Sequence, residues 1–284
     1  MHQILSILEL SSILCLVSLA AVLTFRMAGF PDLSVDGVFA LGSVVFARCF
    51  LGGMGVPVAI LTAMVAGAVA GVFTAAVSVR LRINPLLASV LVLTILYSLN
   101  LRILGRANQP LYSFDTPCWL NSDYSSVFFA LFVGIATVLL YVALRTEIGC
   151  ALRCTGTSPT FLGSVGRNVA LYKLLLVGMA GMLVATSGCF LTVKYGFSDV
   201  SIGTGTIIIG IASLIIGEKI CGRRRLWAQV LAAPVGIFLY ELAVGVALSA
   251  GVSPTDVKLA TGVITIGLLA LGKTERDRLL AQGN

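Results

Sequence analysis

The sequence predicts an all-α protein whose helices cross a membrane several times. Of its 284 residues, 58% are hydrophobic and only 11% are charged, and the mean hydropathy is +1.04. Apolar runs close to the ~20 residues that a spanning helix needs recur along the whole chain. A soluble domain of this size would not bury so much apolar surface in one core. We therefore predict one transmembrane domain over residues 1–284, a bundle of about 8–10 helices.

The candidate spans are the apolar runs 4–25, 37–53, 57–79, 85–104, 127–144, 169–193, 202–217, 226–247 and 257–271. Several are shorter than the ~20 residues of an untilted spanning helix. We expect the runs 37–53 and 202–217 in particular to be broken, tilted or re-entrant.

The basic residues predict the orientation, because Lys and Arg concentrate on the cytoplasmic side of a membrane. If the connection 145–173 is cytoplasmic, alternation of the spans places three further basic groups on that side: Arg80 with Arg82, Lys219 with residues 223–225, and the tail 273–284. The opposite side receives the loop 105–126, which carries Asp115 and Asp123. The C-terminus is thus predicted to be cytoplasmic. The side of the N-terminus stays open, since it depends on whether 37–53 crosses.

Several other classes of protein are disfavoured. The net charge of +7 is spread over separate loops, which indicates topology and contact with membrane lipid rather than nucleic acid. The only histidine is His2 and no C-x-x-C pair occurs among the seven cysteines, so no metal site is predicted. Residues 267–274 match a phosphate-binding loop in letters, but they complete an apolar span and only ten residues follow. We expect neither an enzyme nor a cofactor bound by this chain.

The stretch 149–168 (GCALRCTGTSPTFLGSVGRN) is amphipathic and cannot cross a bilayer, because charges such as Arg153 and Arg167 would be costly at its centre. It can lie at the membrane surface as a short helix that a soluble partner holds. Gly and Pro residues break it and let the chain turn and approach a partner closely.

A second segment, 30–42 (FPDLSVDGVFALG), places Asp32 and Asp36 four residues apart, between Pro31 and Gly37. Two like charges at this spacing are unfavourable on one helix. We therefore expect irregular backbone, with each Asp capping a helix start. Such backbone is tolerated at membrane depth only against protein or a water-filled cavity. The segment is either a discontinuous helix beside a translocation pathway or an ordinary surface turn.

Three further polar or small positions have two interpretations each. Asn100, in the segment 80–111, either bonds to a neighbouring helix or lines a wet pathway. Gly203 and Gly205 either permit close packing or act as hinges for gating. Glu241 needs a partner within the membrane, on a neighbouring helix, at Lys258 or across a dimer interface, or else it takes part in proton coupling.

The segments 30–42, 80–111 and 149–168 resemble bacterial ABC-importer permeases of the branched-chain amino acid, sugar and nucleoside type, and most closely those described as tryptophan/tyrosine transporters. The similarity extends over about residues 30–272. It implies that 149–168 is the coupling-helix region, whose predicted contacts with an ATPase subunit are Arg153, Thr155, Gly156, Pro159, Gly163 and Gly166. It implies a translocation pathway with a broken helix at Pro31, Asp32, Asp36, Gly37, Asn100, Gly203 and Gly205.

The resemblance also implies the partners. A separate cytoplasmic ATPase would hold ATP and Mg, an extracytoplasmic binding protein would deliver substrate, and a second permease copy would complete a homodimer in the bacterial inner membrane. The implied substrate is a small polar solute, an amino acid, aromatic or other, ahead of nucleosides, sugars and vitamins. Two alternatives remain, a stand-alone secondary transporter or channel, and a membrane scaffold. The turn 155–159 (TGTSP) departs from the family in lacking an acid or amide.

Overall fold

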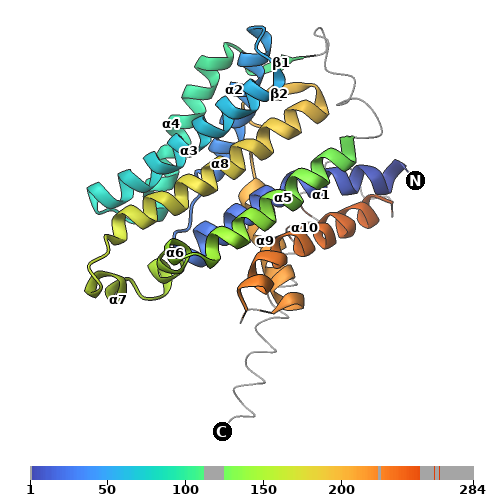
Figure 1. The fold of residues 1–284 in the computed structure, drawn as a ribbon. Coiled ribbons are helices and arrows are strands. Elements are labelled where there is room, and N and C mark those ends of the chain that lie inside the picture. The colour runs from blue at the N-terminus through green and yellow to red at the C-terminus, as the bar shows by residue number, and fades with distance from the viewer. Residues whose placement is uncertain (1, 112–124, 223–224, 250–258, 260–261, 263–284) are drawn as a thin grey trace.

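The computed structural model describes residues 2–111, 125–222, 225–249, 259 and 262. Most of the predicted span 257–271, the tail 273–284 and Lys258 lie outside the described residues. The described chain is a helical bundle (Figure 1), and the prediction of an all-α membrane protein is confirmed. Its helices are α1 (His2–Ala21), which continues as the π-helix η1 (Val22–Met27), α2 (Val35–Leu51), α3 (Val56–Leu81), α4 (Pro85–Leu104), α5 (Ser125–Arg145), α6 (Glu147–Thr157), α7 (Pro159–Ser164), α8 (Val169–Tyr195), α9 (Thr206–Cys221) and α10 (Leu226–Ser249).

Six of the described segments are long and apolar enough to cross a membrane: Leu5–Met27, Val56–Leu81, Pro85–Leu104, Val127–Arg145, Val169–Tyr195 and Leu226–Ser249. The remaining long helices, α2 with 17 residues and α9 with 16, are the predicted runs 37–53 and 202–217. At 1.5 Å per residue, α9 is only about 24 Å long, less than the ~30 Å hydrocarbon core. Both helices follow non-helical backbone, at 28–34 and 200–205.

Two predicted boundaries are corrected. The first span does not stop at residue 25, because the π-helix η1 carries it on to Met27. The run expected over 202–217 becomes helical only at Thr206, after Gly205 adopts the left-handed conformation (φ +91°) at the helix start. Gly203 and Gly205 therefore lie on the connection before α9 and not inside a helix.

Helix α8 lies at the centre of the bundle and packs against α3 through small residues. A side chain at Gly181 would collide with the carbonyl oxygen of Gly67, and one at Gly71 would collide with that of Val177. This is the close approach that a small-x-x-x-small pattern such as Gly67-x-x-x-Gly71 allows between membrane helices. Helices α9 and α10 meet in the same way at Gly217 and Gly236.

We expect Gly181→Val to lower the thermal unfolding midpoint of the detergent-solubilised protein, because the added side chain must push α3 and α8 apart. Overpacking of this kind costs roughly 1–3 kcal/mol, and more where backbone has to move. Gly134→Val is the matched control, since open space surrounds a Cβ at that position. Equal midpoints for the two variants would contradict this packing.

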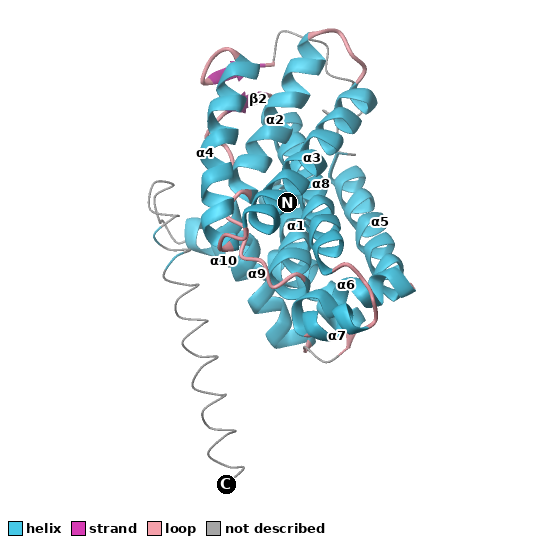
Figure 2. Ribbon diagram, turned by 90° about the vertical axis from the view of Figure 1, so that its left-hand side faces the viewer, coloured by secondary structure: helices cyan, strands magenta, loops and turns pink. Residues whose placement is uncertain are grey.

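The two ends of the bundle differ. At one end, strand β1 (Asn108–Pro110) pairs antiparallel with strand β2 (Phe197–Asp199). The short helices α6 and α7 lie at the other end (Figure 2).

Near the β1–β2 end, Lys194 of α8 forms an ion pair with Glu9 of α1 (Nζ–Oε2, 2.9 Å). The same ammonium acts electrostatically on Glu241, which is buried on α10. Glu241 thus has a basic neighbour on another helix.

Candidate functional site

The first part of the site is the α2–α9 junction, where the carboxylate of Asp36 caps the start of α9. Its Oδ2 accepts a hydrogen bond from the backbone N–H of Gly205 (2.8 Å), and its Oδ1 accepts from the N–H of Ile207 and the hydroxyl of Thr206 (both 2.9 Å). The first N–H groups of a helix have no partner within the helix, and a carboxylate also interacts favourably with the helix dipole. Asp36 therefore fixes the first turn of α9 against the first turn of α2.

Close packing completes this junction. A Cβ on Gly203 would collide with the carbonyl oxygen of Asp36, so the chain before α9 lies directly on the backbone of α2. On the other side of α2, the Nδ2 of Asn100 donates to the carbonyl oxygen of Gly37 (3.1 Å). The Oδ1 of Asn100 is buried and has no hydrogen-bond partner in the described part of the chain. Asn100 thus joins α4 to α2, as its helix-bonding interpretation expects.

Asp32 has a more local role. It lies buried in the 28–34 connection, and its Oδ1 accepts from the N–H (2.9 Å) and the hydroxyl (2.6 Å) of Ser34, the residue before α2. The Ser34 hydroxyl also lies 3.1 Å from that of Thr74 on α3. The expected irregular backbone is found at 28–34, but Asp36 and Gly37 lie inside α2. Asp36 caps the start of another helix, α9, while Asp32 bonds to the residue before α2. Pro31 stands beside Asp32 in this connection, and the lining of a pathway by any of these residues stays a prediction.

The second part of the site is the α7 surface, formed by exposed residues of α7 and of the turn that follows it: Pro159, Phe161, Gly163, Val165 and Gly166. Pro159 starts the helix at a position where its missing N–H costs nothing. Leu162 is buried and anchors α7, whereas Phe161 and Val165 are each 60% exposed. Both are apolar residues in a stretch that does not cross the membrane. Neither residue was among the contacts predicted from the sequence, although their spacing of four places them on one face of a helix.

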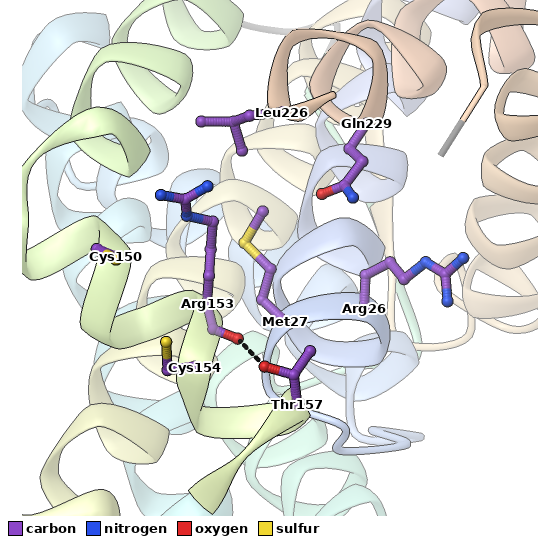
Figure 3. A pocket seen from close by; sticks show the side chains of 8 residues that line it. All are labelled: Arg26, Met27, Cys150, Arg153, Cys154, Thr157, Leu226 and Gln229. Atoms are coloured by element: carbon purple, nitrogen blue, oxygen red, sulfur yellow. Dashed lines mark hydrogen bonds between the residues drawn. The ribbon is translucent and has the colours of Figure 1, made fainter. Parts of the chain in front are cut away.

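The other three predicted contact residues lie on α6, where Thr155 is buried, Arg153 is half-buried and Gly156 is exposed on one side. Thr155 is buried and donates to the carbonyl oxygen of Ala151 (3.0 Å). A Cβ on Gly156 would collide with the carbonyl oxygen of Met27 and would lie 2.9 Å from the nitrogen of Gly29. Arg153 extends into a pocket beside η1 (Figure 3). In this structure α6 therefore rests on the chain's own α1–α2 connection, and contact of these residues with an ATPase stays a prediction.

An ion pair joins the same connection to the far end of α9. The Nε of Arg26 donates to Oε1 of Glu218 (2.6 Å), and its Nη2 donates to Oε2 (3.0 Å). Arg26 is in η1 and Glu218 is in the last turn of α9. Residues 26–36 thus hold α9 at both ends, by Arg26 at its C-terminal end and by Asp36 at its start. Because Gly156 lies against residues 27–29, this segment connects α6 to α9.

The arrangement contains no described cluster that would hold a metal: within the part of the chain that the structure describes, no three His, Cys, Asp or Glu side chains lie together. It combines spanning helices, a short helix with an irregular start between them, and surface helices at one end. These features define a multi-pass membrane protein with irregular backbone between its helices.

The chain belongs to the family described as "Branched-chain amino acid transport system / permease component", which matches residues 3–272. The chain is 36% identical over 273 residues to the "Tyrosine transport system permease protein" of Clostridioides difficile (strain R20291), a match that covers 96% of this chain and 92% of the relative. It is 28% identical over 284 residues to the uncharacterized protein RP368 of Rickettsia prowazekii (strain Madrid E), covering 98% and 100%. No solved structure matches it. The predicted resemblance is confirmed, and the chain is a permease component of an ABC-type transport system.

Proposed function

We propose that this chain is the membrane subunit of an ATP-driven importer for an amino acid, with an aromatic amino acid as the first candidate. The α7 surface carries the proposal, because Phe161 and Val165 expose apolar side chains on a short helix outside the spans. An exposed apolar patch of this kind marks a surface for a protein partner. The partner is a separate ATPase that holds ATP and Mg. The name of the tyrosine transport relative supports the substrate.

In this proposal the chain itself performs no chemistry. The ATPase binds the α7 surface from the cytoplasm, and dimerisation of the ATPase subunits moves α6 and α7. Gly156 transmits this movement to residues 27–29, and the bonds of Arg26 and Asp36 transmit it to the two ends of α9. Movement of α9 then opens or closes a pathway near the α2–α9 junction. We place the chain in the bacterial inner membrane with its C-terminus in the cytoplasm. A second copy of the chain would complete a dimer, and an extracytoplasmic binding protein would deliver the substrate.

Affinity purification from native membranes tests this function. The tagged, detergent-solubilised chain is expected to co-purify with a soluble ATPase close to stoichiometry, and reconstituted complexes are expected to take up tyrosine only with ATP. A chain that purifies alone, under conditions that preserve other ABC complexes, would instead favour a stand-alone secondary transporter.

We expect the double variant Phe161→Glu with Val165→Glu to lose the ATPase during purification while the spans stay inserted. Two carboxylates would have to lose their water in an apolar contact, which is costly without a partner. The matched control, Phe161→Leu with Val165→Leu, keeps the surface apolar and should retain the ATPase. Gel filtration checks that both variants remain folded. Full retention of the ATPase by the Glu variant would exclude α7 as the docking helix.

A further inference from the structure

A pocket of about 470 Å³ opens at the α6–α7 end of the bundle, between η1, α6 and the start of α10 (Figure 3). The residues that line it are Arg26, Met27, Cys150, Arg153, Cys154, Thr157, Leu226 and Gln229. None of them is acidic. The pocket lies beside the ends of two candidate spans, because Met27 closes the first of them and Leu226 opens the last described one. It is therefore at the level where a bilayer would present its head groups.

The pocket carries a positive charge that the described chain does not balance. Arg26 is paired with Glu218 and its guanidinium points away from Arg153. The Nε of Arg153 is buried and has no hydrogen-bond partner among the described residues, and its side chain extends into the pocket that Leu226 and Met27 also line (Figure 3). A buried donor on a charged group is costly when unpaired. A planar guanidinium binds phosphate oxygens well, by parallel N–H···O bonds.

An apolar groove of about 330 Å³ lies next to this pocket, between α5 and α10. Thr137, Val138, Tyr141, Trp227, Val230 and Leu231 line it. The same two turns of α10 line both hollows, since Leu226 and Gln229 line the charged pocket while Trp227, Val230 and Leu231 line the groove. Trp227 is 44% exposed, and Trp and Tyr side chains are typical of the membrane interface. The groove thus lies between two candidate spanning helices, α5 and α10, and neighbours the pocket on α10.

We propose that the pocket and the groove together bind one anionic phospholipid. Its phosphate accepts hydrogen bonds from the guanidinium of Arg153, and one acyl chain lies in the α5–α10 groove. A free phosphate would satisfy Arg153 but would leave the groove without an occupant, so the combination favours the lipid. The bound lipid would contact α6, α10 and η1 at once. It would hold in place the contact between α6 and residues 27–29, whatever protein binds at α7.

Native mass spectrometry of the intact chain in a neutral detergent tests the proposal, with phosphatidylglycerol as the probe. Phosphatidylcholine with the same acyl chains and inorganic phosphate are the comparison ligands. We expect one retained phosphatidylglycerol and a raised thermal midpoint with that lipid alone. Arg153→Gln should weaken its retention roughly tenfold, the effect of losing one charged hydrogen-bonded contact. Arg80→Gln, which removes an exposed charge at the end of α3, should not.

A second variant tests the groove and does not touch the charge. Leu231→Trp adds bulk on a residue that is partly exposed, and it should weaken retention of phosphatidylglycerol while Arg153 is intact. Equal retention of both phospholipids, or equal stabilisation by inorganic phosphate, would overturn the proposal. So would an Arg153→Gln variant that keeps the lipid but loses a co-purifying ATPase, since the guanidinium would then serve a protein partner.

Discussion

Asp36→Ala is expected to unfold at a markedly lower temperature than the unaltered protein and to abolish transport. The substitution removes the acceptor of three hydrogen bonds, from the N–H groups of Gly205 and Ile207 and from the hydroxyl of Thr206. The start of α9 lies against α2, so these donors do not all find water in its place. Hydrogen bonds to a charged group contribute about 1.5–3 kcal/mol each. Because some of the three donors regain a bond to water, we expect a total loss of roughly 3–5 kcal/mol, less than the sum of the three.

The thermal midpoint in detergent and the uptake by reconstituted protein measure the two effects. Asp36→Asn keeps one carbonyl acceptor, so its thermal midpoint should lie between those of the unaltered protein and Asp36→Ala. Asp199→Ala is the matched control, because that carboxylate also accepts backbone and hydroxyl bonds, from Ser201, but it lies on the exposed β1–β2 end. If Asp36→Ala were as stable as Asp199→Ala, the cap of α9 would not be important for the fold.

The bounds of a helix could be predicted from the sequence where local signals mark both of its ends. The predicted span 85–104 coincides with α4, because Pro85 opens its first turn and the side chain of Asn84 accepts from the N–H of Leu86 (2.9 Å). Gly105, with φ +78°, closes it. The end of the first span had no such signal. An apolar run does not show where α-helical hydrogen bonding changes to π-helical bonding, and it is this change that extends the first span to Met27.

Contacts between segments that are far apart in the chain could not be predicted from the sequence. It predicted that Asp36 caps a helix start, but nothing in residues 30–42 shows that this helix begins at Thr206. Likewise, Gly156 was expected to approach a partner protein, and nothing in the sequence shows that it also approaches the backbone of Met27 and Gly29. A glycine that permits close contact looks the same in a sequence whether the contact lies within the chain or outside it. Only the fold shows that Gly156 contacts its own chain, whereas Phe161 and Val165 on the α7 surface are exposed.

Arg26→Met is expected to destabilise the protein by about 3 kcal/mol, at the lower end of the cost of breaking a buried ion pair. The side chain of Glu218 is only 3% exposed, so its charge would lose both hydrogen bonds from Arg26 in surroundings that offer little water. The cost stays at the lower end because the Arg26 side chain is 33% exposed and part of the pair already reaches solvent. Thermal unfolding of the detergent-solubilised variant measures the loss.

The double variant Arg26→Met with Glu218→Met separates the pair from the general effect of substitution. If the loss of the Arg26 bonds by the carboxylate of Glu218 causes the destabilisation, removing that carboxylate as well should recover most of the stability, since apolar side chains often replace a buried pair at little cost. Additive losses in the double-mutant cycle would show that the two residues act independently. Recovered stability with uptake still impaired is the informative result. It would mean that the main role of the ion pair is to couple the movement of α9 to that of residues 26–36, and that its contribution to folding is smaller.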